Sequence, residues 1–437
     1  MIIYRSTEGR SPQHGVFQRG TFVLLAVAAM FLSGCDKPKP IRIGILHSMT
    51  GTMAISEKSV ADATQLAIEE LNQKGGLLGR PIEVIVADGK SDAETFAREA
   101  QRLIQQEKVV ALFGCWTSAS RRTVKPVVER LNHLLFYPVQ YEGLESSPNI
   151  VYTGAAPNQQ IIPAVKWAMD NIGTSFFLVG SDYVFPHTAN AIIRDQVKAL
   201  RGDIVGEEYF LLGSRDVAAV VAKIKATRPK LILNTINGDT NVEFFKALRA
   251  AGITPAEIPV MSFSVGEEEL RSLGGGGTLA GNYAAWNYFQ TTDTPENAAF
   301  VANYKKRYGA DRVTSDPIEA GYFGVHLWAQ AVTAAASADA TQVRLAVRKQ
   351  SFLAPEGMVY VDLDNLHTWK GVRIGKIRPD GQFDIVWRSQ RPVRPVPYPI
   401  YRTKAEWDEF LAALYKSWGN RWENPGPTTV ENGGKDK

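Results

Sequence analysis

The sequence predicts an α/β protein in which two doubly wound, Rossmann-like lobes are joined by a multi-strand hinge. The chain has 437 residues, more than one average hydrophobic core accommodates, which favours two lobes. Short apolar runs alternate with segments of helical periodicity, and this order restarts near residue 176. Such alternation is typical of right-handed crossovers and of parallel sheets covered by helices on both faces.

The first alternation gives three strands and two helices. We expect strands at 41–46, 82–87 and 109–113, because each is a short and mostly apolar run. Apolar residues recur at helical spacing over 60–71 and 96–104, which places a helix between each pair of strands.

The second alternation repeats the pattern with strands expected at 176–180, 204–210, 231–235 and 260–263. Two sheets explain this restart better than one. We expect the chain to cross between the lobes near residues 155–160 and to return near residues 284–290.

The remaining third of the chain completes both lobes. Residues 295–348 are mostly helical and are expected to rejoin the first lobe. Short antiparallel strands at 358–361, 372–377 and 383–387 are expected to complete the second lobe. Four prolines after residue 391 then favour an extended strap.

These boundaries give a predicted division of the whole chain. It comprises a lipoprotein signal peptide (1–34), a tether (35–40), an N-terminal lobe (41–156 with 288–352), a C-terminal lobe (157–287 with 353–390), and a Pro-rich strap with a short helix and flexible tail (391–437).

The N-terminal region predicts export. The apolar run at 21–32 is too short to span a bilayer, and basic residues precede it, as in a secretory signal. The residues Leu32-Ser33-Gly34-Cys35 resemble the lipobox of bacterial lipoproteins, which implies acylation of Cys35. We therefore expect a periplasmic or extracytoplasmic protein held to the cell membrane by a lipid, the alternative being a plain secretory peptide cut nearby.

Charge and composition exclude several other classes of function. The formal net charge is +4, and no run of Lys and Arg with interleaved aromatics marks a nucleic-acid surface. The six histidines show no metal-ligand spacing, so we predict no metal and no cofactor. If Cys35 is acylated, Cys115 has no partner for an intramolecular disulfide.

Polar and aromatic residues follow four short apolar runs, which are the predicted strands at 109–113, 176–180 and 231–235 and the run that ends at Leu134-Leu135. Ligands of open α/β sheets lie beyond the carboxyl ends of the strands, so these residues are the candidate contacts. They are Trp116, Thr117, Ser118, Tyr137, Gln140, Tyr141, Asp182, Tyr183, Phe185, Asn237 and Asp239.

This mixture of donors, acceptors and rings suits a small, flat, neutral and strongly polar guest such as urea. Taken singly, each residue has a structural alternative, because hydroxyls before a helix often cap it and aromatics after a strand often lie in the core. The recurrence of the pattern at four strand ends favours a binding site.

Several longer motifs resemble one branch of a known family. The runs GCWTSASR, FYPVQYEG, SPNIVYTGAAPNQQ, GSDYVFP, NTINGDTN, AAWNYFQ and HTWK are similar to those of the urea-binding and short-chain-amide-binding branch of the type I periplasmic binding proteins. The resemblance implies a hinged two-lobe fold and delivery of the ligand to the permease subunits of an ABC importer. It places the ligand contacts on the residues named above and adds Ser264 and Glu267.

Three alternative functions remain at this point. Cys115 beside Trp116 suggests an amidase nucleophile, but only His47 and His187 lie in loops near the expected cleft, and we predict no enzyme activity. A branched-chain or other amino-acid-binding protein of the same fold is the second alternative. An amide sensor or regulator is the third, since the same cleft serves permeases and sensors alike.

Overall fold

The computed structural model describes residues 38–277 and 279–426. The predicted signal peptide, Cys35 and the last residues of the predicted tail lie outside the described residues. Within the described ranges, no helix is both long and apolar enough to cross a membrane.

A five-stranded parallel sheet forms the first lobe, in the order β2-β1-β3-β4-β5. Its strands are β1 (Ile41–His47), β2 (Ile82–Asp88), β3 (Leu112–Gly114), β4 (Leu135–Tyr137) and β5 (Ile150–Tyr152). The helices of this lobe are α2 (Ala54–Gln73), α3 (Ala93–Gln105), α4 (Ser118–Arg130), α10 (Pro295–Tyr308), α11 (Asp316–Ala335) and α12 (Ala340–Val347).

Helices cover both faces of this first sheet. Successive side chains of a strand point to opposite faces, so neighbours in sequence join different cores. Phe113 of β3 packs edge-on against Trp328 of α11, with ring centroids 5.8 Å apart. The adjacent Leu112 lies instead with Leu103 of α3 and Val124 of α4.

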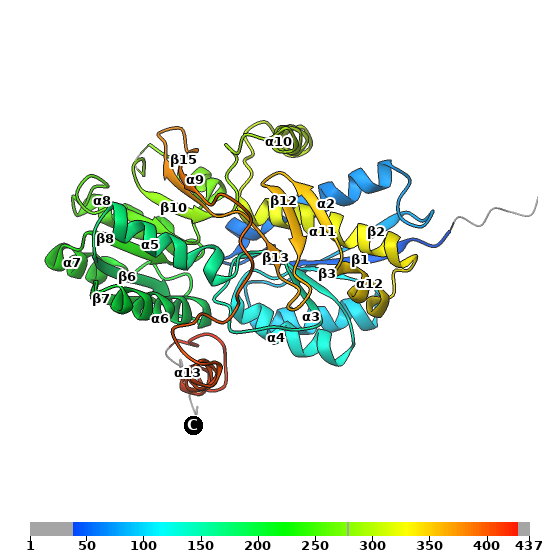
Figure 1. Cartoon of the computed structure of the whole chain (residues 1–437), viewed down its shortest axis with the longest axis horizontal. Helices are drawn as coiled ribbons and strands as arrows, with labels where there is room; N and C mark the ends of the chain where they lie inside the picture. Colours follow the sequence, from blue (N-terminus) through cyan, green and yellow to red (C-terminus); the bar gives the residue numbers. More distant parts are fainter. Residues whose placement is uncertain (1–37, 278, 427–437) are drawn as a thin grey trace, which may run out of the picture. The chain divides into compact units, whose positions relative to one another are not determined.

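A seven-stranded sheet forms the second lobe, in the order β15-β14-β10-β9-β8-β6-β7, with β14 and β15 antiparallel to their neighbours. Its strands are β6 (Ser175–Ser181), β7 (Asp203–Phe210), β8 (Leu231–Thr235), β9 (Val260–Ser262), β10 (Tyr283–Trp286), β14 (Arg373–Ile377) and β15 (Phe383–Arg388). Figure 1 shows β1, β2 and β3 in one half of the view and β6, β7 and β8 in the other.

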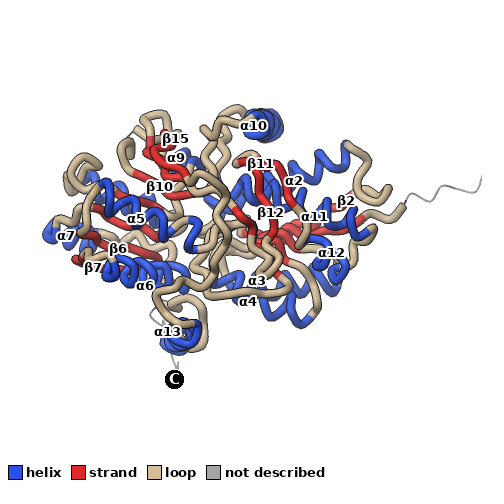
Figure 2. The backbone as a smooth tube through the Cα atoms, in the orientation of Figure 1, coloured by secondary structure: helices blue, strands red, loops and turns tan. Residues whose placement is uncertain are grey.

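The second sheet is also covered on both faces. Its helices are α5 (Ile161–Asn171), α6 (Val184–Ala199), α7 (Ala218–Thr227), α8 (Thr240–Ala250), α9 (Glu267–Ser272) and α13 (Lys404–Ser417), and the short 3₁₀ helix η2 (Pro157–Gln159) lies in the segment that leads into α5. Phe176 lies in the core with α5, α6 and α13, whereas the next residue, Phe177, lies in the core with α7, α8 and α9. Figure 2 shows the strands of both lobes flanked by helices. The predicted α/β fold with two doubly wound lobes is confirmed.

One strand is placed differently from the prediction. The segment expected to join the second lobe, 358–361, lies in β12 (Gly357–Val361), which pairs with β11 (Ser351–Ala354) and β13 (Thr368–Trp369) in a separate three-stranded antiparallel sheet. The buried residues of β12, Val359 and Val361, pack into the core of the first lobe. The prediction was wrong here because an alternating apolar pattern marks a strand without specifying its partner.

Up to β14, three segments of the described chain cross between the lobes. They lie between β5 and α5, between β10 and α10, and between β13 and β14. The side-chain amide of Asn287, in the second crossing, donates to the carbonyl of Gln159 at 3.0 Å and to that of Gly371 at 2.6 Å. A single buried side chain therefore ties all three crossings together.

The three crossing segments form the hinge between the lobes, and a buried ion pair lies within it. The Nζ atom of Lys370 donates to the carbonyl of Thr153 at 3.0 Å and lies 3.1 Å from Oε1 of Glu356. Oδ2 of Asp316 accepts from the backbone N–H groups of residues 287 and 288 at 2.8 and 2.9 Å. Burial raises the pKa of Glu356 to about 7.

Candidate functional site

The carboxyl ends of the parallel strands of the two lobes face each other. Side chains that follow β1, β3 and β4 in the first lobe contact residues that follow β8 and β9 in the second. We call this contact region the seam. It is formed by Thr52, Ser56, Trp116 and Gln140 of the first lobe and by Asn237, Asp239, Phe263 and Glu269 of the second.

Direct hydrogen bonds close the seam. Nε1 of Trp116 donates to Oδ1 of Asn237 at 3.3 Å, and the hydroxyl of Thr52 donates to Asp239. The hydroxyl of Ser56 donates to Oε1 of Glu269 at 2.6 Å. The structure therefore describes the two lobes in contact, as in the closed state of a hinged binding protein.

The predicted donors at the start of α4 already have partners. Thr117 caps the helix, its hydroxyl oxygen accepting from the N–H of Ser120 at 3.0 Å. The hydroxyl of Ser118 donates to Glu142 and accepts from Nη1 of Arg121 at 2.9 Å. These hydroxyls are committed within the chain in this state, so their predicted contact with a ligand stays a prediction.

A buried charge cluster lies behind these hydroxyls. The Arg121 guanidinium is completely buried and pairs with Glu142 at 3.2 Å and Glu145 at 3.0 Å. Arg122 also contacts Glu142, at 3.1 Å. Burial acts to raise the pKa of Glu145, but the positive charges of Arg121 and Arg122 outweigh it and hold this pKa at about 2. The cluster therefore holds two positive and two negative charges.

Sequence reasoning missed this cluster. Arg121 ends the motif GCWTSASR, and Glu142 lies within FYPVQYEG, so both motifs pointed to the right segments. The pairing joins residues 24 and 21 positions apart, and only the fold shows that they meet.

The predicted tyrosine walls belong partly to the core of the first lobe. The Arg121 guanidinium lies over the rings of Tyr137 and Tyr141, at 4.8 and 4.3 Å from their centroids. The hydroxyl of Tyr137 donates to the carbonyl of Trp116 at 2.6 Å, and the hydroxyl of Tyr141 meets Nε2 of His367. Tyr137 thus holds the backbone of Trp116 in place beside the seam.

The second lobe carries the remaining aromatic candidates. Tyr183 is buried just before α6, and its ring lies 6.2 Å from that of Phe185. Burial raises the pKa of Tyr183, and Tyr137 and Glu142 of the first lobe raise it further. The charges of the first-lobe cluster therefore affect the pKa of Tyr183.

Asp182 has partners on both carboxylate oxygens. Oδ1 lies 2.7 Å from Nε2 of His187, and Oδ2 accepts from the side-chain amide of Asn424 at 2.5 Å. Burial acts to raise the pKa of Asp182, but the hydrogen bonds from His187 and Asn424 lower it overall. The structure thus gives Asp182 contacts within its own lobe and the C-terminal segment, and its role as a ligand acceptor stays a prediction.

Several buried polar atoms have no hydrogen-bond partner in the described part of the chain. Among them are Oε1 of the seam residue Gln140 and Oε2 of Glu267, which lies two residues before Glu269 of the seam. The Gln140 amide nitrogen donates to the carbonyl of Phe263 at 2.8 Å and lies 3.3 Å from the Ser264 hydroxyl. Burial raises the pKa of Glu267 to about 8, which favours the neutral form of this carboxyl at pH 7. Buried polar atoms without partners mark places where a guest can form hydrogen bonds.

The environment of Cys115 does not favour a nucleophile. The thiol is completely buried, and burial raises its pKa, so it stays protonated at neutral pH. Nδ1 of His47 lies 2.9 Å from Oε2 of Glu57, and Ser120 is the hydrogen-bond partner of the thiol. Among the described residues, no group of three or more His, Cys, Asp and Glu side chains is arranged to hold a metal ion.

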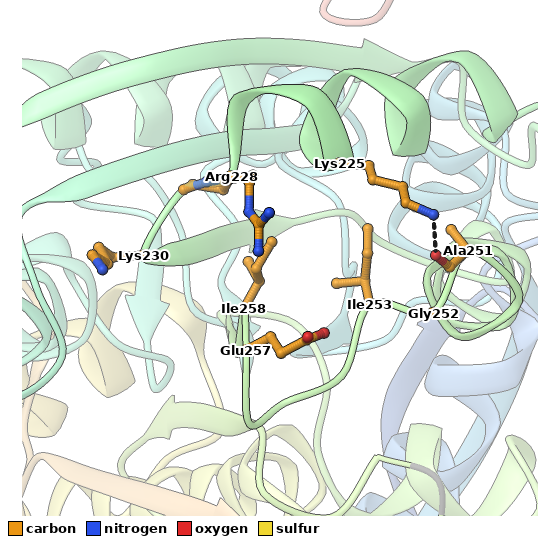
Figure 3. Close-up of a pocket in the computed structure, with 9 residues that line it drawn as sticks. Lys225, Arg228, Lys230, Ala251, Gly252, Ile253, Glu257 and Ile258 are labelled. Carbon is orange, nitrogen blue, oxygen red and sulfur yellow. Dashed lines mark hydrogen bonds between the residues drawn. The ribbon is translucent and has the colours of Figure 1, made fainter.

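A separate cavity of about 480 Å³ lies at the opposite edge of the second sheet (Figure 3). Lys225, Arg228 and Lys230 line it, and Lys225 donates to the carbonyl of Ala251 at 2.8 Å. These residues precede the start of β8 at Leu231, whereas the predicted contacts follow the end of that strand. The cavity is therefore not part of the seam.

Comparison with known proteins places this geometry in a family. Residues 41–404 match the family described as periplasmic binding protein domain. The chain belongs to this family. As a member, this chain is a solute-binding protein.

Curated relatives of the binding protein share modest identity. Leu/Ile/Val-binding protein homolog 6 of Brucella melitensis is 22% identical over 346 residues, which cover 77% of this chain and 87% of that protein. A limonene hydroxylase of Geobacillus stearothermophilus is 38% identical over 118 residues, which are 27% of this chain and only 22% of that protein. The second match is thus confined to a fragment of both proteins.

Solved structures share the fold of the binding protein. A solute-binding protein of an ABC transporter from R. palustris, in complex with 4-hydroxybenzoate, has a TM-score of 0.73 at 23% identity and covers 82% of this chain and 98% of its own. A leucine-binding protein from Thermotoga maritima has a TM-score of 0.70 at 21% identity, covering 80% and 98%. These names concern benzoates and amino acids, so the resemblance to the amide-binding branch stays a prediction.

Proposed function

We propose that this binding protein is the solute-binding component of an ABC importer and captures urea or a short-chain amide between its lobes. The observation that carries the proposal is that Gln140 and Glu267, two buried residues with polar atoms that lack a hydrogen-bond partner, present neutral groups. Oε1 of Gln140 is an amide acceptor, and the protonated carboxyl of Glu267 is a neutral donor or acceptor.

The charged groups near the seam support a neutral guest. In the buried cluster, Arg121 and Arg122 pair with Glu142 and Glu145, so the charges of the cluster balance one another. A zwitterionic amino acid needs a charged partner for its ammonium and another for its carboxylate, because burying an unpaired charge costs several kcal/mol. Urea and short amides need only hydrogen bonds, which neutral groups supply.

A branched-chain amino acid is the second candidate, supported by the names of the Brucella and Thermotoga relatives. For this ligand, Asp182 would have to exchange its bond to His187 or Asn424 for the ammonium. A regulator that senses amides is a further alternative, since it would use the same seam with a different partner.

Titration calorimetry separates these candidates. We expect urea, acetamide or formamide to bind with measurable heat, and leucine and 4-hydroxybenzoate to give none. Glu267→Gln keeps a neutral group of similar shape and is expected to retain binding, whereas Glu267→Ala removes the hydrogen bond and weakens it about tenfold. Binding of leucine alone, with no amide bound, would contradict the proposal.

We further propose that the protein is exported and anchored to the membrane through lipid on Cys35. The lipobox-like residues 32–35 support this proposal. Labelling of cells with a radioactive fatty acid is expected to mark the wild-type protein and not Cys35→Ser. Equal labelling of both proteins, or of neither, would contradict an anchor at this residue.

A further inference from the structure

The chain continues past the part that matches the family. The match ends at residue 404, the first residue of α13, and the rest of this helix lies beyond it together with residues 418–426. Helix α13 packs on the second lobe, where Trp407 and Leu411 join the core with α6. Figures 1 and 2 both show α13 beside α6.

The segment after α13 is bonded to the second lobe around Tyr183. The N–H of Val184 donates to the carbonyl of Trp422 at 2.9 Å, and the N–H of Asn424 donates to the carbonyl of Asp182 at 3.0 Å. The Asn424 side-chain amide also donates to Oδ2 of Asp182 at 2.5 Å. These bonds form an antiparallel bridge between Tyr183 and Glu423, as in the addition of a short strand.

The same segment contacts the first lobe. The guanidinium of Arg122 lies over the ring of Trp422, 4.7 Å from its centroid. Arg122 is itself held by Glu142 of the buried charge cluster, at 3.1 Å. A cavity of about 260 Å³ separates the rest of the segment from α3 and α4, and both sides line it.

The strap before α13 is also tied to the first lobe. The carbonyl of Pro397 accepts from the N–H of Leu144 at 2.8 Å. Arg402 then pairs with Asp195 of α6 in the second lobe, at 2.6 Å. The C-terminal region therefore passes from the first lobe to the second and returns to contact both.

We propose that residues 418–424 form a clasp that holds the lobes closed and positions Tyr183 for the ligand. Trp422 and Asn424 are its positioning residues. Opening of the hinge moves the start of α4 away from the start of α6, and this motion separates Arg122 from Trp422. The effect on affinity rests on the proposed function, but the effect on opening does not.

The first test measures the distance between the lobes without any ligand. Spin labels at Gln105→Cys of α3 and Ala222→Cys of α7, in a Cys35→Ser background, report this distance, since both sites are exposed and Cys115 is buried. A chain ending at residue 417 lacks the clasp, and a chain ending at residue 426 keeps it. We expect the shorter chain alone to show a longer and broader distance distribution. Identical distributions for both truncations and the full chain would overturn the clasp.

Point variants guard against a folding defect of the truncation. Trp422→Ala and Asn424→Ala are each expected to lengthen the distance between the lobes. Trp422→Phe keeps a ring under Arg122 and is expected to retain the wild-type distance. Lys416→Ala, at an exposed position of α13, is the control and is expected to leave the distance unchanged. Unchanged distances in both alanine variants, with normal melting curves, would also overturn the clasp.

The second test measures ligand release by stopped-flow fluorescence with urea and acetamide. In Trp422→Ala, which loses the contact with Arg122, the amide is expected to dissociate about 5- to 10-fold faster than from the wild type. The association rate of the amide is expected to change by less than about twofold. Lack of amide binding by the wild type would contradict the proposed function, while the distance measurement would still decide on the clasp.

Discussion

The indole nitrogen of Trp116 donates to the side-chain carbonyl of Asn237 across the seam, at a distance of 3.3 Å. This bond joins the second residue after β3 of the first lobe to the second residue after β8 of the second. Because its two partners belong to different lobes, the bond stabilises the contact between the lobes and not the fold of either lobe.

Trp116→Phe is expected to weaken ligand binding about 3- to 10-fold. The substitution keeps a ring and removes only the donor to Asn237, which corresponds to a net loss of about 1 kcal/mol. Calorimetry with the bound amide measures the change. Without ligand, Trp116→Phe should lower the melting temperature far less than Tyr137→Phe does, because Tyr137→Phe removes a hydrogen bond inside the first lobe.

Arg121→Met is expected to destabilise the protein by about 3–5 kcal/mol. The substitution leaves the completely buried carboxylates of Glu142 and Glu145 without their partner, and uncompensated buried charge is costly. Unfolding in guanidinium chloride measures the loss, and urea is avoided because it is a candidate ligand. Lys166→Ala is the control, since its exposed pair with Asp170 contributes less than about 0.5 kcal/mol.

The stability of the protein is expected to depend on pH through Glu267. Its pKa is raised by burial to about 8, from 4.5, so the folded state binds more protons than the unfolded state between these values. Stability therefore falls as pH rises from about 4.5 to 8, by at most about 1.4 kcal/mol per pH unit. Unfolding of wild type and Glu267→Gln at several pH values should show a smaller fall in the variant. Parallel curves would contradict this role of Glu267.

Asn287→Ala is expected to lower the melting temperature by several degrees. The carbonyls of Gln159 and Gly371 both lose a donor in the buried hinge, at a cost of about 1–3 kcal/mol. Differential scanning calorimetry measures the shift. Asn171→Ala removes one exposed bond, to the carbonyl of Trp167, and should change the melting temperature little.

Cys115 is expected to stay unreactive in the native protein. Its thiol is buried and protonated, so a disulfide reagent should modify it only after unfolding in guanidinium chloride. Cys35→Ser provides a protein in which Cys115 is the sole thiol. Rapid modification of the folded protein would reopen the question of a reactive cysteine.

The sequence predicted the strand and helix pattern well because burial on both faces leaves long apolar runs, such as Ile41–His47 and Ser175–Ser181. It failed for Gly357–Val361, where a short alternating strand found its partners in a third sheet. For the site, it identified the strand ends that meet. It could not show that Asp182 binds Asn424, 242 residues later, because such pairing depends on the finished fold.

The interleaved path of the chain has a consequence for the order in which the protein can be made. The core of the first lobe needs β12 (Gly357–Val361), and the sheet of the second lobe needs β15 (Phe383–Arg388). A chain synthesised from its amino terminus thus lacks part of the first lobe until more than four-fifths of it has been made, and part of the second lobe until nearly nine-tenths has been made. Contacts between residues far apart in sequence slow folding, so both lobes of the newly made chain remain incompletely folded and accessible to other proteins until synthesis is almost complete.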